Sequence, residues 1–494
     1  MARIGYDTER KLQLKIMTQE EEDAIHWASL DLLWNTGMSI YSKRSLDILK
    51  ENGAEVDYSK KRARIPNALV QEALKRFPRA YRLCGRTKEN DVKLDGRHVY
   101  FSTDATGIAT YDLETGERRK STKEDVKKVA ILTDYLPGVA VFNPSVTPLE
   151  VPAHTHTLHE LDVGLNYTEK HTMVEAVYIK EEAQTEIKMA SLVVGGESEL
   201  KRRPIISSIM CCICPLTLDG GAMDASLTFS GAGVPVHLMS MPQAGTTAPA
   251  TLAACVAINN AEILGANTIL QLAHPGAPVL YSTVGSPMDL RTGGYGGGGR
   301  PETALINAAG VQMSKRYGMP SSPGSMGCMA KVIGPQIGHE HTLVPLTMAL
   351  VGGDVLNGIG MLEGSLVLSF EQMLIDHEIA TAVLRLISGF SVTDESLSLS
   401  MIDRIGPRGS FLQEQHTYKH MKEIWDPTLS DLRPYDVWKA AGAETMEQVA
   451  HRKAKDILAK HKPVPLDPEV SRELKSIISE VEKKPFPKGT SENW

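Results

Sequence analysis

Short apolar runs alternate with helix-like patterns through the middle of the chain, between Val99 and Phe390. Runs of four to eight apolar or β-branched residues bounded by Gly, Pro or polar residues are typical of buried strands, and apolar positions three and four apart are typical of helices. We predict strands over residues 99–103, 139–144, 171–178, 204–211, 235–241, 268–272, 319–326 and 355–360. Helices are predicted between them, among them 123–133, 181–194, 222–230, 248–264, 302–317 and 339–350.

Strands and helices that alternate in this way predict an α/β fold. Eight pairs over roughly 290 residues favour a (β/α)₈ barrel, or TIM barrel, which typically needs ~250 residues. An open, doubly wound parallel sheet would give the same alternation and remains the alternative.

Both ends of the chain have a different pattern, in which helices dominate. Thr18 precedes Glu20, Glu21 and Glu22, so a capping hydroxyl followed by acidic residues predicts a helix start there. We therefore divide the chain into a helical N-terminal extension (1–97), a TIM-barrel catalytic domain (98–390) and a helical C-terminal extension (391–494).

Composition narrows the class of protein. The net charge of −7 does not favour binding to nucleic acid, and we find no uninterrupted apolar run of the ~18 residues that a membrane span needs. The charged N-terminus lacks the apolar core of a signal peptide, and the six irregularly spaced cysteines suit reduced thiols. We expect a cytoplasmic protein that binds neither nucleic acid nor membrane, and that could form a homo-oligomer.

Residues 279–342 hold the densest group of candidate functional positions. Two Gly-rich loops, 291–300 and 321–327, flank the predicted helix 302–317, and glycine allows backbone to approach a ligand closely. Active sites of TIM barrels lie at the carboxyl ends of the strands. That rule selects strand-end residues such as Asp104, Glu175, Cys211, Gln243 and Arg291, although most loop residues only connect elements.

A metal site is a competing interpretation of one segment. His154, His156, His159 and Glu160 lie close together at a predicted helix start, and imidazole is a zinc ligand. Short His tracts are only suggestive, so a solvated helix start is the simpler reading. Cys211, Cys212 and Cys214 have no second cysteine pair, and burial suits them better than a thiolate site.

Several long blocks in the same order resemble the trimethylamine methyltransferase family, the corrinoid-dependent methylamine enzymes. The longest is GSPMDLRTGGYGGGGRPETALINAAGVQMSKRYGMP, which starts at Gly285. The others are SLDLLWNTGMSIYSKRSLDILKENGAEVD from Ser29, RIPNALVQEALKRFP from Arg64, GMLEGSLVLSFEQMLIDHEI from Gly360 and GPRGSFLQEQHTYKHMKEIWDPTLSDL from Gly406.

The resemblance implies a TIM barrel that transfers a methyl group from an amine to the Co(I) corrinoid, a cobalamin, of a separate partner protein, with no tightly bound metal of its own. Founding members carry pyrrolysine after the seventh strand, at a position that matches the loop near Val332 here. This sequence has an ordinary residue there. Members without pyrrolysine include enzymes that demethylate quaternary amines, so glycine betaine or a related betaine is the implied substrate.

Roles for side chains follow from that substrate. Tyr295 and Phe370 are candidates for contact with the trimethylammonium, and Glu175 or Glu363 for its countercharge. A substrate carboxylate could meet Arg291, Lys331 or His339. We identify no certain catalytic residue.

Other classes of protein stay open at this point. One is a noncatalytic ligand-binding member of the family, and another is a metal-dependent barrel hydrolase that uses His154, His156, His159 and His274. An S-adenosylmethionine enzyme would need a strand directly before Gly294 and an acid about twenty residues later, and this sequence has neither.

Overall fold

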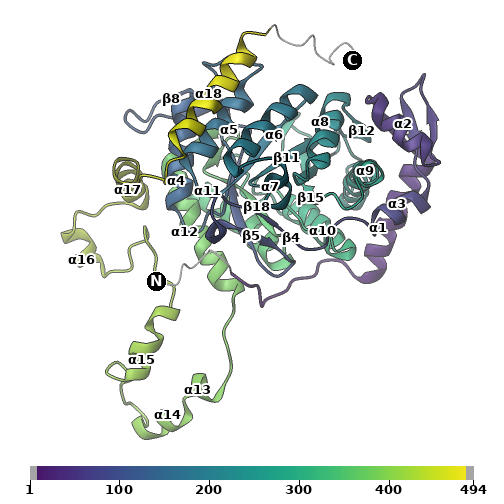
Figure 1. The fold of residues 1–494 in the computed structure, drawn as a ribbon. Coiled ribbons are helices and arrows are strands. Elements are labelled where there is room, and N and C mark those ends of the chain that lie inside the picture. Colours follow the sequence, from purple (N-terminus) through teal and green to yellow (C-terminus); the bar gives the residue numbers. More distant parts are fainter. Residues whose placement is uncertain (1–7, 485–494) are drawn as a thin grey trace.

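A parallel sheet lies at the centre of the fold in the computed structural model, which describes residues 8–484 (Figure 1). Seven strands follow the order β15-β13-β11-β10-β9-β6-β18, and every pairing is parallel. Their bounds are β6 (Tyr100–Thr103), β9 (Val141–Phe142), β10 (His171–Ala176), β11 (Ile206–Cys211), β13 (Val236–Ser240), β15 (Val279–Thr283) and β18 (Val355–Ile359). Because they are parallel, their carboxyl ends all point to one side.

Segment 320–326 has backbone bonds to both edge strands of this sheet. The N–H of Tyr281 in β15 donates to the Pro320 carbonyl over 2.8 Å, and Gly324 donates to Thr283 over 3.0 Å. On its other side, the N–H of Val355 in β18 donates to Ser321 over 3.1 Å. Isolated parallel bridges join Tyr281 to Ser321 and Gly324 to Asn357.

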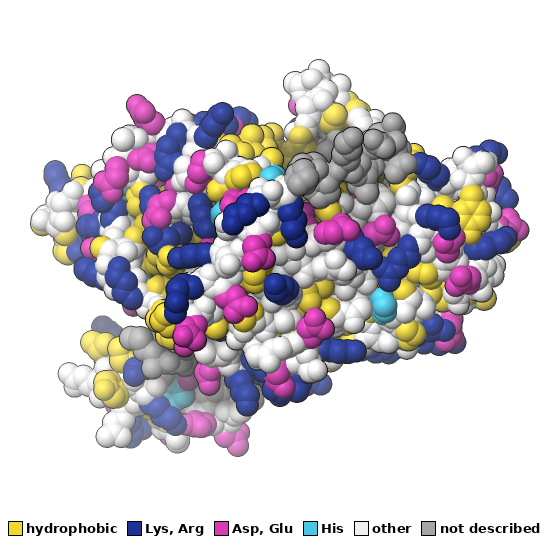
Figure 2. All heavy atoms as spheres, turned by 45° about the horizontal axis from the view of Figure 1, so that its top comes forward, with side chains coloured by type: hydrophobic (Ala, Val, Ile, Leu, Met, Phe, Trp, Pro, Cys, Tyr) yellow, Lys and Arg dark blue, Asp and Glu magenta, His cyan; other side chains and the backbone are white. Residues whose placement is uncertain are grey.

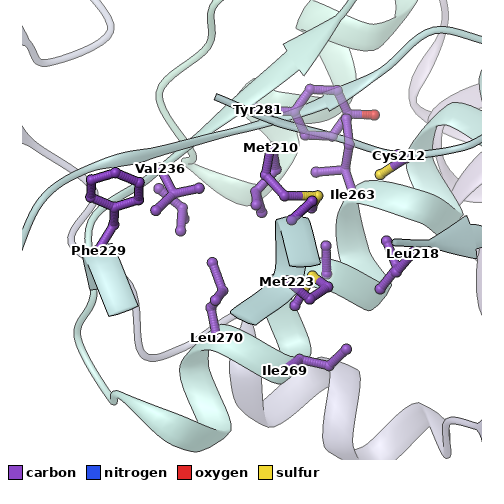
Figure 3. Packing of buried hydrophobic residues seen from close by; sticks show 14 of the residues in the cluster. Met210, Cys212, Leu218, Met223, Phe229, Val236, Ile263, Ile269, Leu270 and Tyr281 are labelled. Atoms are coloured by element: carbon purple, nitrogen blue, oxygen red, sulfur yellow. The ribbon is translucent and has the colours of Figure 1, made fainter. Parts of the chain in front are cut away.

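Helices cover the outer face of the sheet (Figure 1). They are α4 (Lys123–Tyr135), α5 (His156–Tyr167), α6 (Lys180–Val194), α8 (Gly220–Gly231), α9 (Leu252–Ala273), α10 (Pro301–Tyr317), α11 (Pro335–Val351) and α12 (Phe370–Ile387). Met210 and Val236 from the strands pack with Met223, Phe229 and Leu270 from the helices (Figure 3). The side chains that face outward from each strand are therefore buried against the helices, and this packing sets which face of each strand points outward.

One predicted strand is wrong. Residues 268–272 continue α9, and the strand that takes this place in the sheet is β15. The apolar run there is buried on several sides against α1 (Gln19–Asp31), α10 and β13, so a buried helix and a buried strand give the same pattern. α9 is long and apolar enough to cross a membrane, but 83% of its apolar window is buried inside the fold, as in a core helix.

The N-terminal extension is only partly helical. Besides α1, α2 (Lys43–Glu51) and α3 (Asn67–Ala73), it contains the short strands β1 (Met38–Ile40), β2 (Glu55–Asp57), β3 (Arg62–Arg64), β4 (Tyr81–Leu83) and β5 (Val92–Leu94). The helix start at Thr18 is confirmed, since its hydroxyl and Glu21 form a capping box. Short strands of three residues carry too little periodicity to be recognised beside the helical segments.

Strands β4 and β5 form a hairpin with a defined place in the fold. Leu83, Val92 and Leu94 belong to a buried cluster with Tyr100, Val141, Met173, Ile209, Leu280 and Val355, which come from six strands of the central sheet. The residues of this cluster on β6 and β18 open those strands, so the hairpin fills the side nearer the amino ends. The hairpin thus leaves the carboxyl ends of the strands uncovered, where a functional site can form.

The C-terminal extension begins with short helices that project away from the body: α13 (Asp394–Leu397), α14 (Leu399–Ile405) and α15 (Gln415–His420) (Figure 1). None of these three helices contains a buried residue. After α16 (Tyr435–Ala440), helix α17 (Met446–Lys460) packs on α12 and α4, and α18 (Pro468–Glu482) packs on α5 and α6. The helical character predicted for this region is thus present.

Candidate active site at the carboxyl ends of the strands

Tyr295 stands on a small sheet above the carboxyl end of β15. It lies in β17 (Gly294–Tyr295), which pairs antiparallel with β16 (Ser286–Asp289) and places Tyr295 opposite Met288. The residue is 41% exposed. Its ring packs on Gly364, where an added Cβ would lie only 3.2 Å from the ring carbon Cδ1. Gly364 has φ +67°, so glycine here permits both the turn and the close approach of the ring.

The two Gly-rich loops lock together beside this ring. Gly298 has φ +72°, and an added Cβ would meet the Cys328 backbone at 2.7 Å. The N–H of Gly299 donates to the Gly327 carbonyl over 3.0 Å. Glu340 on α11 accepts from the Met329 N–H at Oε2 over 2.8 Å and from the Gln336 amide at Oε1 over 2.8 Å. The loop that carries Val332 is thus held at both its start and its end.

Two carboxyl groups lie at the carboxyl ends of β6 and β10, the two strands that flank β9 in the sheet. Asp104 follows β6 and accepts a 2.7 Å hydrogen bond from the Ser365 hydroxyl, and Glu175 lies near the end of β10 with its side chain 15% exposed. Burial raises the pKa of Asp104, and it raises the pKa of Glu175 well above its usual range. The charge of Asp104 further raises the pKa of both Glu175 and Tyr295. Sequence reasoning selected Asp104 by position but gave it no role.

A third acid and a histidine adjoin Glu175. His156, at the start of α5, lies with Nδ1 3.1 Å from Glu160 Oε1 and 4.0 Å from Glu175 Oε2. Glu160 is 2% exposed, and burial raises its pKa well above the usual range. The sequence paired His156 with Glu160 as candidate metal ligands but did not add Glu175 to them. Helix α5 and strand β10 are brought together only by tertiary packing, which the sequence pattern does not show.

Cys211 ends β11 next to Glu175 and is a poor nucleophile. Burial, and then the charge of Glu175, raise the pKa of its thiol to about 12. Cys212 is buried in the apolar layer (Figure 3), and the Cys214 thiol donates to Glu262 over 3.0 Å. At neutral pH these thiols are protonated, which agrees with the structural use favoured from the sequence.

Glu363 lies beside the Val332 loop. Its backbone N–H donates to Ala330 over 3.0 Å, and its carboxylate is 3.4 Å from Arg118 Nε. Glu363 is therefore already paired with a permanent cation, whereas Glu175 lies among other acids, with His156 Nδ1 4.0 Å away.

Three further predicted residues are exposed around the same loops. Lys331 donates from Nζ to the Met329 carbonyl over 2.6 Å, and His339 lies on an exposed position near the start of α11. Arg291 is exposed, and its backbone N–H donates to Asp289 over 3.1 Å. Val332 is 67% exposed. These positions rim the carboxyl-end face and do not enter its interior.

Phe370 lies elsewhere. It is fully buried at the start of α12, in the apolar cluster between helices and strands that contains Phe101 and Met373. Lys128 Nζ lies 5.5 Å from its ring centroid. The aromatic signal in the sequence could not distinguish a core ring from a ligand-facing one.

The four histidines of the hydrolase hypothesis do not gather at one point. His159 contacts Lys123 Nζ at 3.1 Å and Glu482 at 3.0 Å, away from the partners of His156. His274 caps the end of α9, which precedes β15 and so lies at the opposite end of the strands.

Comparison with known proteins agrees with this geometry. The model of the family described as Trimethylamine methyltransferase (MTTB) matches residues 4–484. Trimethylamine methyltransferase MttB of Desulfitobacterium hafniense is 35% identical, over 94% of this chain and 93% of its own length. Glycine betaine methyltransferase of the same species is 30% identical, over 94% and 96%.

A solved structure is similar in fold. Monomethylamine methyltransferase (MtmB) of Methanosarcina barkeri superposes with a TM-score of 0.53 at 13% identity, over 92% of this chain and 90% of that chain. The family match and the named methyltransferases among the relatives cover nearly the whole chain. This protein is therefore an enzyme, a methyltransferase, and belongs to the trimethylamine methyltransferase (MTTB) family.

Proposed function

We propose that this enzyme transfers a methyl group from a quaternary amine, glycine betaine or a related betaine, to the Co(I) corrinoid of a partner corrinoid protein. The observation that carries the proposal is the placement of Asp104 and Glu175 at the carboxyl ends of β6 and β10, close to the Tyr295 ring. That ring packs on Gly364, and the next residue, Ser365, donates to Asp104 over 2.7 Å. Two acids and one aromatic face are the groups that attract a cation with no hydrogen to donate.

Val332 supports a quaternary rather than a tertiary amine. It stands near the position where, by family resemblance, trimethylamine enzymes carry pyrrolysine, and it offers only an exposed aliphatic side chain. Of the two relatives described above, one is named for trimethylamine and the other for glycine betaine, so identity alone does not decide the substrate.

The chemistry of a quaternary amine suits the groups present. When the C–N bond breaks, its electron pair stays on nitrogen, and the amine leaves neutral without a proton. The methyl group goes to the acceptor substrate, the Co(I) corrinoid. The protein's part is to orient the methyl group and to exclude water. Protonated thiols and buried carboxyl groups are then no obstacle, because no side chain has to act as a nucleophile.

Each predicted contact takes a role in this proposal except Phe370, which is buried, and Glu363, which is paired with Arg118. Tyr295 faces the trimethylammonium. The bound cation opposes the raised pKa of Glu175 and favours its ionised form, so Glu175 supplies the countercharge in preference to Glu363, which is already paired with Arg118. Arg291, Lys331 and His339 are exposed at the rim, where a carboxylate at the far end of the substrate can reach a cation.

The rim also suits a partner protein. The loops after seven of the strand positions each carry a large apolar side chain that is at least 39% exposed: Ile108, Leu149, Tyr178, Met241, Leu290, Val332 and Leu366. Exposed apolar groups in such number suit an interaction surface. A corrinoid bound by a partner must approach this face to meet the substrate. The face drawn in Figure 2 has Lys, Arg, Asp and Glu side chains interspersed.

We infer further that the sheet closes into the predicted eight-stranded TIM barrel, with segment 320–326 as the seventh strand in sequence. Support comes from its backbone bonds to β15 on one side and β18 on the other. Closure places the ends of β6, β10 and β15 around one mouth.

We also propose that the chain associates with itself, through a second copy that covers residues 390–424. Leu412, Tyr418 and Phe390 are each at least 80% exposed there, and the short helices have no core of their own. Arg385 ties the end of the segment to the body by donating to the Glu423 carbonyl over 2.9 Å. Light scattering should give a dimer or larger, and Leu412→Asp should shift it toward monomer. A wild-type monomer would contradict this.

The test of the function uses purified protein, cob(I)alamin kept reduced and a panel of N-methylated amines. Methylcobalamin should form with a betaine. Glu175→Gln should raise KM for the betaine by about 10-fold, the value of a lost buried cation contact of ~1.4 kcal/mol, while Glu363→Gln should change it less. Equal effects of the two variants would remove Glu175 as the countercharge. No transfer, even with the native corrinoid protein, would contradict the function.

A further inference from the structure

Three side chains in the candidate active site have the types and spacing of metal ligands. They are His156 and Glu160 from the first turns of α5, and Glu175 from the end of β10. His156 Nδ1 lies 3.1 Å from Glu160 Oε1 and 4.0 Å from Glu175 Oε2, and one ligand atom from each residue lies within 4.8 Å of the others.

Other acids surround this group. Glu182 and Glu186 of α6 lie close enough that Glu182 raises the pKa of Glu160, and Glu160 and Glu175 both raise the pKa of Glu186. Burial is the larger cause in each case, and the charge of His156 opposes it at Glu175. So much buried negative charge is costly unless protons or a cation neutralise it.

Unsatisfied oxygens point to a missing ligand. Glu160 is 2% exposed, its Oε1 faces His156, and its Oε2 has no hydrogen-bond partner within residues 8–484. Glu186 is fully buried, and neither of its oxygens has a partner within the same range. Buried carboxylate oxygens nearly always have a hydrogen bond or a metal. Glu160 Oε2 is therefore available to bind a ligand.

We propose that His156, Glu160 and Glu175 bind one divalent transition-metal cation, of the zinc or manganese class. One imidazole and two carboxylates are a donor set that these ions accept. Ligand atoms on opposite sides of such an ion lie about 4.2 Å apart, since each bond is about 2.1 Å. Small side-chain rotations therefore suffice to close the present spacing around an ion.

This inference goes beyond the proposed methyl transfer and departs from the expectation of a metal-free protein. The cation joins α5 to the end of β10 and fixes the Glu175 carboxylate in the candidate active site. Five carboxyl groups, those of Asp104, Glu160, Glu175, Glu182 and Glu186, influence one another here. A divalent cation favours the ionised forms of its two carboxylate ligands, Glu160 and Glu175.

The test counts metal ions and needs no activity measurement. Full-length protein is stripped with EDTA, desalted and titrated with Mn²⁺ or Zn²⁺, and the bound ions are counted by mass spectrometry. We expect one equivalent on the wild type. His156→Ala and Glu160→Gln should each weaken binding by about 10- to 100-fold. His159→Ala is the matched control on the same helix, and should bind as the wild type does.

A spectroscopic measurement keeps the test sharp if a variant does not fold. Pulsed electron paramagnetic resonance of Mn²⁺ on the wild type should detect coupling to one imidazole nitrogen. Binding that survives in His156→Ala and Glu160→Gln, the absence of nitrogen coupling, or no stoichiometric binding of either ion would each overturn the site. In the last case, protons rather than a metal ion neutralise the carboxyl groups. The methyl-transfer proposal does not depend on this result, because it is tested by methylcobalamin formation.

Discussion

The Glu340 carboxylate holds the backbone of Met329, whose N–H donates to Oε2 over 2.8 Å. Glu340 is the sixth residue of α11, and Met329 lies in the loop before that helix. Val332 follows three residues after Met329. By family resemblance, it lies near the position at which founding members carry pyrrolysine. Glu340, from the helix that follows, thus holds this loop together with Glu363, whose N–H donates to the Ala330 carbonyl.

Removing that carboxylate should loosen the loop. Glu340→Ala leaves the Met329 N–H without its acceptor, which should cost about 1–3 kcal/mol in the free energy of unfolding. Hydrogen exchange measured by mass spectrometry should rise over residues 327–334. Glu302→Ala, at an exposed first-turn position of α10, is the control and should leave exchange there unchanged. Unaltered exchange in Glu340→Ala would show that the loop is held by other contacts.

Gly293 and Gly298 have nearly the same φ, so replacing each by alanine distinguishes the cost of a left-handed backbone from the cost of a steric clash. Gly298 has φ +72° and Gly293 has φ +71°, but only at Gly298 would a Cβ meet backbone, at 2.7 Å from Cys328 Cα. Gly293→Ala therefore measures the cost of the left-handed conformation alone. Gly298→Ala should lose a further 1–3 kcal/mol or so in a denaturant titration, because the facing loop has to move. Equal losses would mean that the two loops are not in contact in solution.

The Tyr295 ring should contribute to affinity for a cation. Tyr295→Leu removes the aromatic face, and a cation–π contact is worth about 0.5–2 kcal/mol, so the Kd for a betaine should rise by roughly 2- to 30-fold. Tyr295→Phe keeps the face and should stay close to the wild type. Calorimetry with the same betaine measures all three proteins. If Phe weakens binding as much as Leu does, the hydroxyl group rather than the ring makes the contact.

The buried His341–Asp376 pair should make stability depend on pH. Nδ1 of His341 lies 2.7 Å from the Asp376 carboxylate, and both side chains are fully buried. Burial alone lowers the pKa of His341, but Asp376 and, to a smaller extent, Cys328 together more than offset this and raise the pKa to about 10. Since the unfolded chain has the lower value of about 6.5, the stabilisation is complete below pH ~6.5 and is lost as the pH rises toward 10.

Urea unfolding between pH 6 and 10 measures this dependence. The free energy of unfolding of the wild type should fall across that range, and His341→Gln should flatten the slope. His339→Gln, two residues away and exposed, should keep the wild-type slope. A wild-type slope that persists in His341→Gln would assign the pH dependence to other groups.

Periodicity predicted most of the central strands, because each outward-facing layer packs on a helix and leaves a clear apolar run. It failed at residues 268–272, where a helix buried on several sides carries the same run as a strand. It also missed the β4–β5 hairpin, because strands of three residues are too short to show a hydrophobic period. Leu83 and Val92 of this hairpin nevertheless pack against the inner face of the central sheet.

The candidate site was predictable in part for similar reasons. The strand-end rule selected Glu175 and Asp104 from position alone, and the Gly-rich loop singled out Tyr295. Phe370 was selected for its ring, but its burial depends on the packing of α12. The meeting of His156, Glu160 and Glu175 depends on how α5 packs on β10, so no spacing along the chain could show it.

The most direct test of the methyl-transfer account is one product balance. Enzyme, glycine betaine and reduced corrinoid are mixed, and the methylated corrinoid and dimethylglycine are quantified in the same sample, with trimethylamine in a parallel reaction. The account predicts equal amounts of the two products from the betaine and no methyl transfer from trimethylamine. Transfer from trimethylamine at a similar rate, or methylated corrinoid without the matching dimethylglycine, would contradict it.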